Sequence, residues 1–269
     1  MNVNSIDMRA VLSKVPAVTL TFWIIKILAT TLGETGGDTV TMTWLGETTA
    51  NPNPNGYLIG TAIFLSALVV MVVWQTMAKK FHPFLYWATI VASTTAGTAM
   101  ADFFDRSLGI GYTGGASILL LCVIASLAAW YFSEGTVSVN TVNSPKVEAF
   151  YWITITFSQT LGTALGDWAA DTGGLGYGDG VLVFAAALAV IALAYYFTKI
   201  SHVALFWMAF ILTRPLGATA GDLLDKPVSD GGLSISRPLA SLIIAAAIVV
   251  CILVFPQRAG SHTATATSR

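Results

Sequence analysis

The stretch TLGTALGDWAAD, residues Thr160 to Asp171, ends a long apolar run that begins near Phe150. It places two carboxylates beside a segment apolar enough to enter a membrane, where ionised groups are costly. Related stretches recur at residues 31–40 (TLGETGGDTV), 95–105 (TAGTAMADFFD) and 215–225 (PLGATAGDLLD). This recurrence predicts that the chain is built from copies of one acidic element.

Alignment of the copies on tryptophan gives the pattern W-x9-G-x4-D four times without a gap. Its glycines are Gly33, Gly97, Gly162 and Gly217, and its aspartates are Asp38, Asp102, Asp167 and Asp222. A small residue before each aspartate completes a G-x3-[GA] spacing, which lets helices approach closely in lipid. Five residues turn a helix by roughly 500°, so the aspartate lies about 140° from the glycine. We therefore expect the glycines to pack helices and the aspartates to face a shared cavity.

Composition identifies an integral membrane protein, because 55% of the residues are hydrophobic and only 10% are charged. Soluble domains carry about 25% charged residues. A span needs roughly 20 mostly apolar residues, and eight segments qualify: 15–35, 57–78, 83–102, 115–133, 148–168, 180–198, 203–223 and 236–255. With two spans in each, all copies run the same way across the membrane. We predict an all-α protein with eight transmembrane helices in four parallel two-helix repeats.

The expected organisation is a single transmembrane domain over residues 1–256, with repeats at about 15–78, 83–133, 148–198 and 203–255. Residues 257–269 are polar and predict a disordered cytoplasmic tail. Most basic residues fall on one side of the spans, which places both termini in the cytoplasm of a bacterial inner membrane. Eleven of the fourteen acids fall on the other side, so this outer side is the candidate functional one.

Several carboxylates at one depth repel one another, so they need a cation or a base beside them, or else hold protons. Oxygen ligands favour Mg, Ca or Mn. We expect the four aspartates, as metal ligands or proton carriers, to be the centre of a cation site. An outer acidic funnel is expected from Glu34, Asp105, Asp171 and Asp225. The alternative is that these acids cap helix ends or simply reach water.

Hydroxyl and basic side chains near the motif are candidate supporting residues. The hydroxyls are those of Thr31, Thr95, Thr160, Thr98 and Thr163, which alternatively bond carbonyls of their own helices. Lys26 and Arg214 lie eight residues before Glu34 and Asp222, roughly 12 Å along a helix. We therefore expect each base to meet an acid of another repeat, either as a structural ion pair or as a substitute for the cation.

Other function classes lack their sequence patterns. No nucleophile–histidine arrangement and no phosphate-binding loop stands out, so we expect neither an enzyme nor a permanently bound cofactor. The basic residues are too sparse for a nucleic-acid partner.

The chain without its tail resembles a bacterial family of multi-pass proteins, described as uncharacterised membrane-anchored proteins, that carry repeated G-x3-[GA]-D motifs. The stretch GETGGDT, Gly33 to Thr39, is also similar to the Glu-x-Gly-Asp motif of manganese/calcium cation–proton exchangers. This second resemblance implies export of a divalent cation against protons, with Glu34 and Asp38 as ligands.

These observations favour a secondary transporter that exchanges a cation, Mn or Ca, for protons. The alternatives are a cation channel and a non-transporting sensor or scaffold with structural ion sites. The sequence gives neither the direction of transport nor the oligomeric state.

Overall fold

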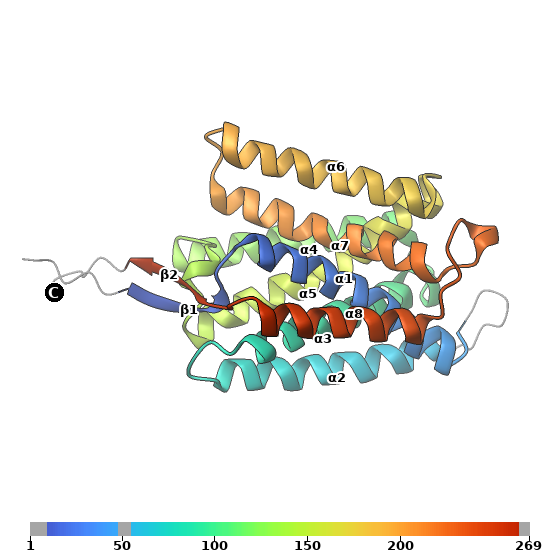
Figure 1. The fold of residues 1–269 in the computed structure, drawn as a ribbon, viewed down its shortest axis with the longest axis horizontal. Coiled ribbons are helices and arrows are strands. Elements are labelled where there is room, and N and C mark those ends of the chain that lie inside the picture. The colour runs from blue at the N-terminus through green and yellow to red at the C-terminus, as the bar shows by residue number, and fades with distance from the viewer. Residues whose placement is uncertain (1–9, 48–54, 264–269) are drawn as a thin grey trace, which may run out of the picture.

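The computed structural model describes residues 10–47 and 55–263 of the chain. In this part, eight long helices lie side by side along one direction (Figure 1). They are α1 (Leu20–Asp38), α2 (Gly56–Met77), α3 (Pro83–Asp102), α4 (Gly111–Glu134), α5 (Pro145–Asp167), α6 (Gly176–Phe197), α7 (His202–Asp225) and α8 (Arg237–Val254). The shortest has 18 residues and the longest 24, or about 27 to 36 Å at 1.5 Å per residue, which matches the apolar core of a bilayer.

Each of the eight predicted spans coincides with one of these helices, although not all are equally apolar. Within the described residues, α2, α4, α6, α7 and α8 are long and apolar enough to cross a membrane. Helices α1, α3 and α5 carry threonines, serines and acids that are buried in the protein. Because their polar side chains contact other helices, these three helices do not have to be apolar on every face.

The first helices of the four repeats form a closed ring. Helix α1 packs on α3, α3 on α5, α5 on α7, and α7 returns to α1. The second helices lie outside this ring, where α2 packs on α3, α4 on α5, α6 on α7 and α8 on α1. Each outer helix therefore covers the inner helix of the next repeat, and the last repeat covers the first.

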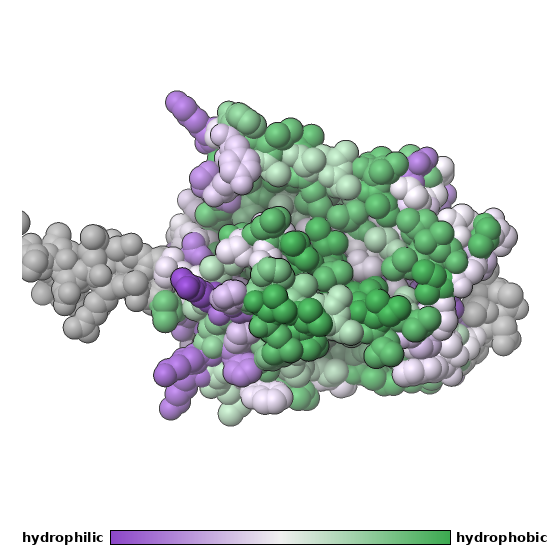
Figure 2. Space-filling model, in the orientation of Figure 1, coloured by the Kyte–Doolittle hydropathy of each residue, from purple (hydrophilic) through white to green (hydrophobic). Residues whose placement is uncertain are grey.

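The outer helices turn apolar side chains away from the ring. Leu121 on α4, Leu182 on α6 and Leu242 on α8 are exposed. Figure 2 shows hydrophobic side chains across the middle of one face and hydrophilic ones gathered at the end that leads to the termini. This distribution fits a protein that crosses a membrane with its helices parallel to the normal.

The inner helices of the first three repeats continue past the motif aspartate in π-helical turns. These are η1 (Thr39–Trp44), η2 (Phe103–Ser107) and η4 (Trp168–Thr172). In the fourth repeat Pro227 lies two residues after the end of α7, and its missing amide cannot continue a helix. The π-helical turns lie directly beside the motif acids, where such irregular turns are common in functional sites.

A short two-stranded ribbon pairs a segment from the beginning of the described chain with one from its end. Strand β1 (Ala10–Pro16) pairs antiparallel with β2 (Ala259–Thr263), at the end of the bundle where α1 begins and α8 ends (Figure 1). The motif acids lie at the opposite ends of the inner helices. The expected disorder of the tail therefore does not hold for Ala259–Thr263, and residues 264–269 lie outside the described part. The polar composition hid this strand because its partner lies at the other end of the sequence. We call the ribbon end the basic end and the opposite one the acidic end.

Candidate cation site

Glycines bring the inner helices together at the acidic end. A Cβ atom on Gly97 of α3 would lie 2.9 Å from the carbonyl carbon of Gln159 and 3.0 Å from the amide nitrogen of Thr160, both on α5. Only glycine allows the two backbones to approach so closely. The equivalent close contacts join Gly33 to Thr94, Gly162 to Arg214 and Gly217 to Thr30. Each motif glycine thus packs against the next helix of the ring, which leaves the acids on another surface.

The four motif aspartates are buried at the ends of their helices and are paired by two bases. Arg106 lies 3.1 Å from Asp102 and 3.5 Å from Asp167. Lys226 lies 2.8 Å from Asp38 and 3.0 Å from Asp222. Each base thus binds the aspartate of its own repeat and that of the next. The packing follows a fourfold pattern, whereas the charges follow a twofold one.

One turn further in, Arg214 joins all four inner helices. Its Nη2 atom, on α7, lies 3.0 Å from Glu34 Oε2 of α1. The same atom donates to the hydroxyls of Thr98 on α3, at 2.6 Å, and Thr163 on α5. Because α7 and α3 lie opposite each other in the ring, these side chains meet at its centre.

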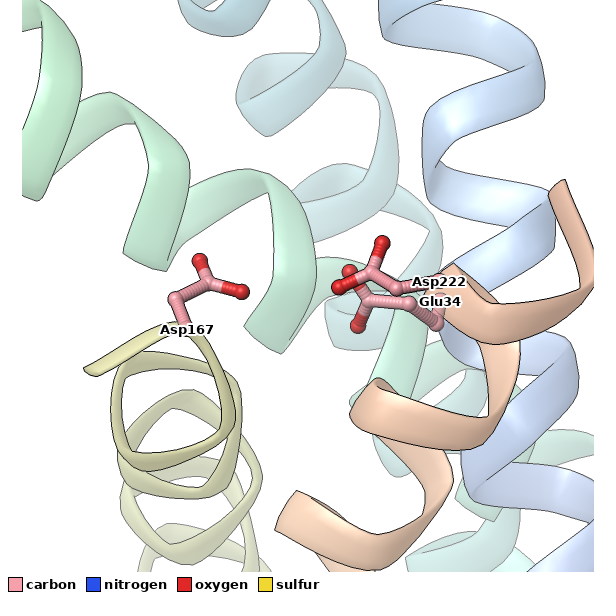
Figure 3. A group of neighbouring side chains, drawn as sticks. All are labelled: Glu34, Asp167 and Asp222. Atoms are coloured by element: carbon pink, nitrogen blue, oxygen red, sulfur yellow. The ribbon is translucent and has the colours of Figure 1, made fainter. Parts of the chain in front are cut away.

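Within residues 10–47 and 55–263, two groups of three carboxylates have the spacing of a cation site. Glu34, Asp167 and Asp222 form one group, drawn in Figure 3, and Asp38, Asp222 and Asp225 form the other. Within each group, one oxygen of every residue lies within 4.8 Å of the others. All-oxygen donor sets suit hard cations such as Mg, Ca or Mn. Asp222 belongs to both groups, so the two cannot be filled independently.

Some oxygens in this region accept no hydrogen bond from any residue that the structure describes. They include Oδ1 of Asp38 and both carboxylate oxygens of Asp225, although Arg237 Nε lies 3.5 Å from Asp225 Oδ2. Buried carboxylate oxygens without donors are expensive. A cation or a proton at these atoms would satisfy them.

The four acids expected to form an outer funnel lie in different places in the structure. Glu34 is fully inside the ring and Asp225 joins the second carboxylate group. Asp105 is buried apart from both groups, against Gly115 of α4. Asp171 is exposed. Of the four aspartates predicted as metal ligands, Asp102 belongs to neither three-carboxylate group and is held by Arg106.

The expected threonines behave in two ways. Thr98 and Thr163 contact Arg214 at the centre of the ring. The hydroxyls of the other three donate to carbonyls of their own helices: Thr31 to Ile27, Thr95 to Val91 and Thr160 to Thr156. These three therefore cap backbone groups, which is the alternative that the sequence left open.

Lys26 and Arg214 are each expected to meet an acid of another repeat, and only one of them does. Arg214 meets Glu34 of another repeat, as expected. The same expectation is wrong for Lys26, whose Nζ lies 4.2 Å from the centre of the Phe210 ring and has no hydrogen-bond partner among the described residues.

Sequence reasoning did not assign Arg106, Lys226 or Arg237 to the site. A signal existed for two of them, because Arg106 and Lys226 follow their motif aspartates by four residues, the spacing at which opposite charges pair on a helix. Arg237 at the start of α8 reaches Asp38 and Asp225 only through tertiary packing.

Two charged groups just outside the helices have shifted pKa values. Burial opposes the charge of Lys226, but Asp222, Asp38 and Asp225 hold the pKa of its amine well above the usual value. Burial raises the pKa of Asp105 to about 6, against the opposing effect of Arg106. Lys226 thus stays charged at neutral pH, whereas Asp105 is partly protonated in mild acid.

Fold and site together define a multi-pass helical membrane protein that encloses clusters of buried acids. The family model described as "Repeat of Unknown Function (DUF347)" matches residues 21–81, 85–136, 150–201 and 205–258. The chain therefore belongs to this family, and the matched segments coincide with the four internal repeats. No curated protein and no solved structure matches the chain. The resemblance to cation–proton exchangers finds no support in these comparisons.

Proposed function

We propose that the protein is a secondary transporter that exchanges a cation, a divalent one such as Mn or Ca, for protons. The observation that carries the proposal is the set of buried acids at the ends of the inner helices. They are Glu34, Asp38, Asp102, Asp105, Asp167, Asp222 and Asp225. The bases paired with them are Arg106, Arg214, Lys226 and Arg237. The acids outnumber these bases by three, so additional positive charge is needed to keep all of them ionised.

The site supports reversible occupancy because bases already stand where a cation would bind. Arg214 contacts Glu34 of the first carboxylate group, and Lys226 contacts Asp38 and Asp222 of the second. An entering cation would displace these bases from the carboxylates. When the cation leaves, the bases or protons neutralise the acids again. Such competition is the basis of exchange.

The proposal keeps the expected orientation, with the acidic end facing outward from a bacterial inner membrane. The field of the clustered acids would concentrate cations at this end.

A scaffold that does not transport is the second candidate, favoured by the ion pairs themselves. Arg106 and Lys226 cross-link neighbouring repeats, and removing one partner of a buried pair is strongly destabilising. In a scaffold these pairs only hold the ring closed.

The test uses purified protein in liposomes that contain a pH-sensitive dye. Gradients of Mn, Ca, Mg, Na and K are imposed in turn on wild type, Asp167→Asn and Asp171→Asn. We expect a proton signal with Mn or Ca that Asp167→Asn abolishes. Asp171→Asn should retain the signal because Asp171 is exposed and belongs to neither carboxylate group.

Silence with every ion, from wild type that is folded and inserted, would reject the exchanger and favour the scaffold. Ion flux without movement of protons would instead identify a channel. Thermal unfolding of all three proteins in detergent provides the check on folding.

A further inference from the structure

Lys26 is a fully buried base that the proposed site leaves unexplained. Its side chain is 0% exposed, and its amine lies against the Phe210 ring of α7 with no acceptor among the described residues. Lys26 precedes Glu34 by eight residues on α1, which places it about 12 Å deeper in the bundle. It also lies six residues after the start of α1 at the basic end. Lys26 thus stands between the carboxylates and the opposite side of the bundle.

No carboxylate pairs with Lys26 in the part of the chain that the structure describes. On α7 the neighbouring charged group is Arg214, which has the same sign. Helix α3 has Ile90 and Thr94 at the positions equivalent to Lys26 and Thr30. The buried side chains of α8 are Ala240, Ile244, Ile248 and Ile252. On α1 itself, the next charged residue toward the acidic end is Glu34, two turns away and paired with Arg214.

The other buried or partly buried bases are guanidinium groups or are paired with carboxylates. Arg106, Arg214 and Arg237 remain charged because guanidinium groups do not lose protons in proteins. Lys226 is held by Asp38 and Asp222, and Lys14 lies 2.6 Å from Glu148. Among these described bases, Lys26 alone combines an amine with the lack of a carboxylate partner. A buried amine of this kind gives up its proton most readily.

We infer that Lys26 carries the proton exchanged for the cation, with Arg214 transmitting the charge between the two positions. This inference rests on the proposed function. A cation that binds Glu34, Asp167 and Asp222 takes the Glu34 charge away from Arg214 and adds positive charge above Lys26. The N–H bond of Lys26 then breaks, its electron pair stays on nitrogen and the proton passes to solvent. When the cation leaves, the amine takes up a proton again.

The test counts protons released when Mn or Ca binds to the purified full-length protein in weakly buffered detergent solution. Wild type is compared with Lys26→Met, Lys26→Arg and Lys80→Met, a control at an exposed lysine. Metal binding releases protons from groups linked to the site. We expect Lys26→Met to bind the cation at least as tightly as wild type while releasing about one proton fewer per cation. Lys26→Arg should lose the same proton and bind more weakly, because its charge is permanent.

Wild-type proton release from both Lys26 variants would overturn the inference even if transport itself were established. Failure of the proposed function gives a different result, because wild type and Lys80→Met would then bind no cation at all. That result would also reject the role of Lys26. Because loss of a buried unpartnered amine does not remove a favourable ion pair, Lys26→Met is expected to fold. The melting temperature of each variant verifies this, and Lys26→Arg gives an independent readout in a side chain that keeps the charge.

Discussion

Arg214 is fully buried, and Glu34, Thr98 and Thr163 surround one end of its guanidinium. Among the described residues, its Nε and Nη1 atoms donate to no partner. The ion pair is thus incomplete on one side, and its energetic value depends on Glu34.

We predict that Arg214→Met destabilises the protein by about 3–5 kcal/mol, the usual cost of leaving one partner of a buried pair uncompensated. Adding Glu34→Gln should recover a large part of this loss, because it removes the buried carboxylate that Arg214→Met leaves without a partner. Thermal and denaturant unfolding in detergent measure the coupling between the two changes. Purely additive effects would show that the pair does not interact.

Asp105 provides a pH-dependent prediction. Its pKa rises from 3.8 to about 6 on folding, so the folded protein binds the proton more tightly than the unfolded chain. This residue therefore lowers stability progressively as pH rises from about 4 to about 6, and the penalty persists above that range. A shift of two pKa units corresponds to about 3 kcal/mol at most, and partial solvation by water should reduce it to about 1 kcal/mol.

Asp105→Asn should consequently unfold at a higher temperature than wild type at pH 7.5, and the difference should vanish near pH 4. Melting curves across this pH range provide the measurement. A constant difference at all pH values would mean that the substitution acts through packing rather than through the charge.

Residues of the site were predictable from sequence to the extent that they repeat. The motif aspartates and glycines stand at fixed intervals, so their common role could be deduced without a structure. The partner of Arg214 was predictable only as an acid of another repeat. The failure for Lys26 has a physical reason, because only the packing of α7 reveals that a phenyl ring, not an acid, faces its amine.

At the level of helices, the hydrophobic runs located all eight elements, since the thickness of a bilayer fixes their length. The ribbon was missed because the pairing of β1 with β2 is satisfied by backbone atoms far apart in sequence. The order in which outer helices cover inner ones was equally hidden. It depends on packing between repeats, which periodicity within one repeat does not encode.

Glycine contacts between helices give a matched pair of predictions. A Cβ on Gly97 would strike the backbone of α5, which cannot move aside, whereas one on Gly36 would meet only a leucine methyl at 3.9 Å. Gly97→Ala should therefore destabilise the bundle by about 1–3 kcal/mol. Gly36→Ala should be neutral or stabilising by up to about 1 kcal/mol, because alanine favours the helix. Equal effects in unfolding experiments would contradict the close packing of α3 on α5.

At the scale of the whole molecule, the closed ring of inner helices should form wherever the chain begins and ends within it. Residues Ala10 and Thr263 are paired in the ribbon, so a short linker can join them. The exposed turn after α6, between Lys199 and Ile200, can then be opened. Exposed turns tolerate such permutation best.

We predict that this circular permutant inserts in the membrane, unfolds cooperatively and binds the same cation as wild type. Its new ends lie at the basic end, as the ribbon does. A control permutant opened between Gly174 and Leu175 has its ends at the acidic end and should insert poorly, because its first segments must enter in the opposite sense. Protease accessibility in vesicles and cation binding distinguish the two. Poor insertion of both permutants would mean that the ribbon must begin and end the natural chain.

The covering of α1 by α8 also has a consequence for biosynthesis. Helix α1 is made before α8, so it obtains this outer neighbour only when the fourth repeat has left the ribosome. Until then α1 must wait in the membrane with a lysine, a glutamate and an aspartate not yet enclosed. An unfinished chain would thus present these charges to lipid or to the insertion machinery, which gives cellular quality control a means of telling truncated copies from complete ones.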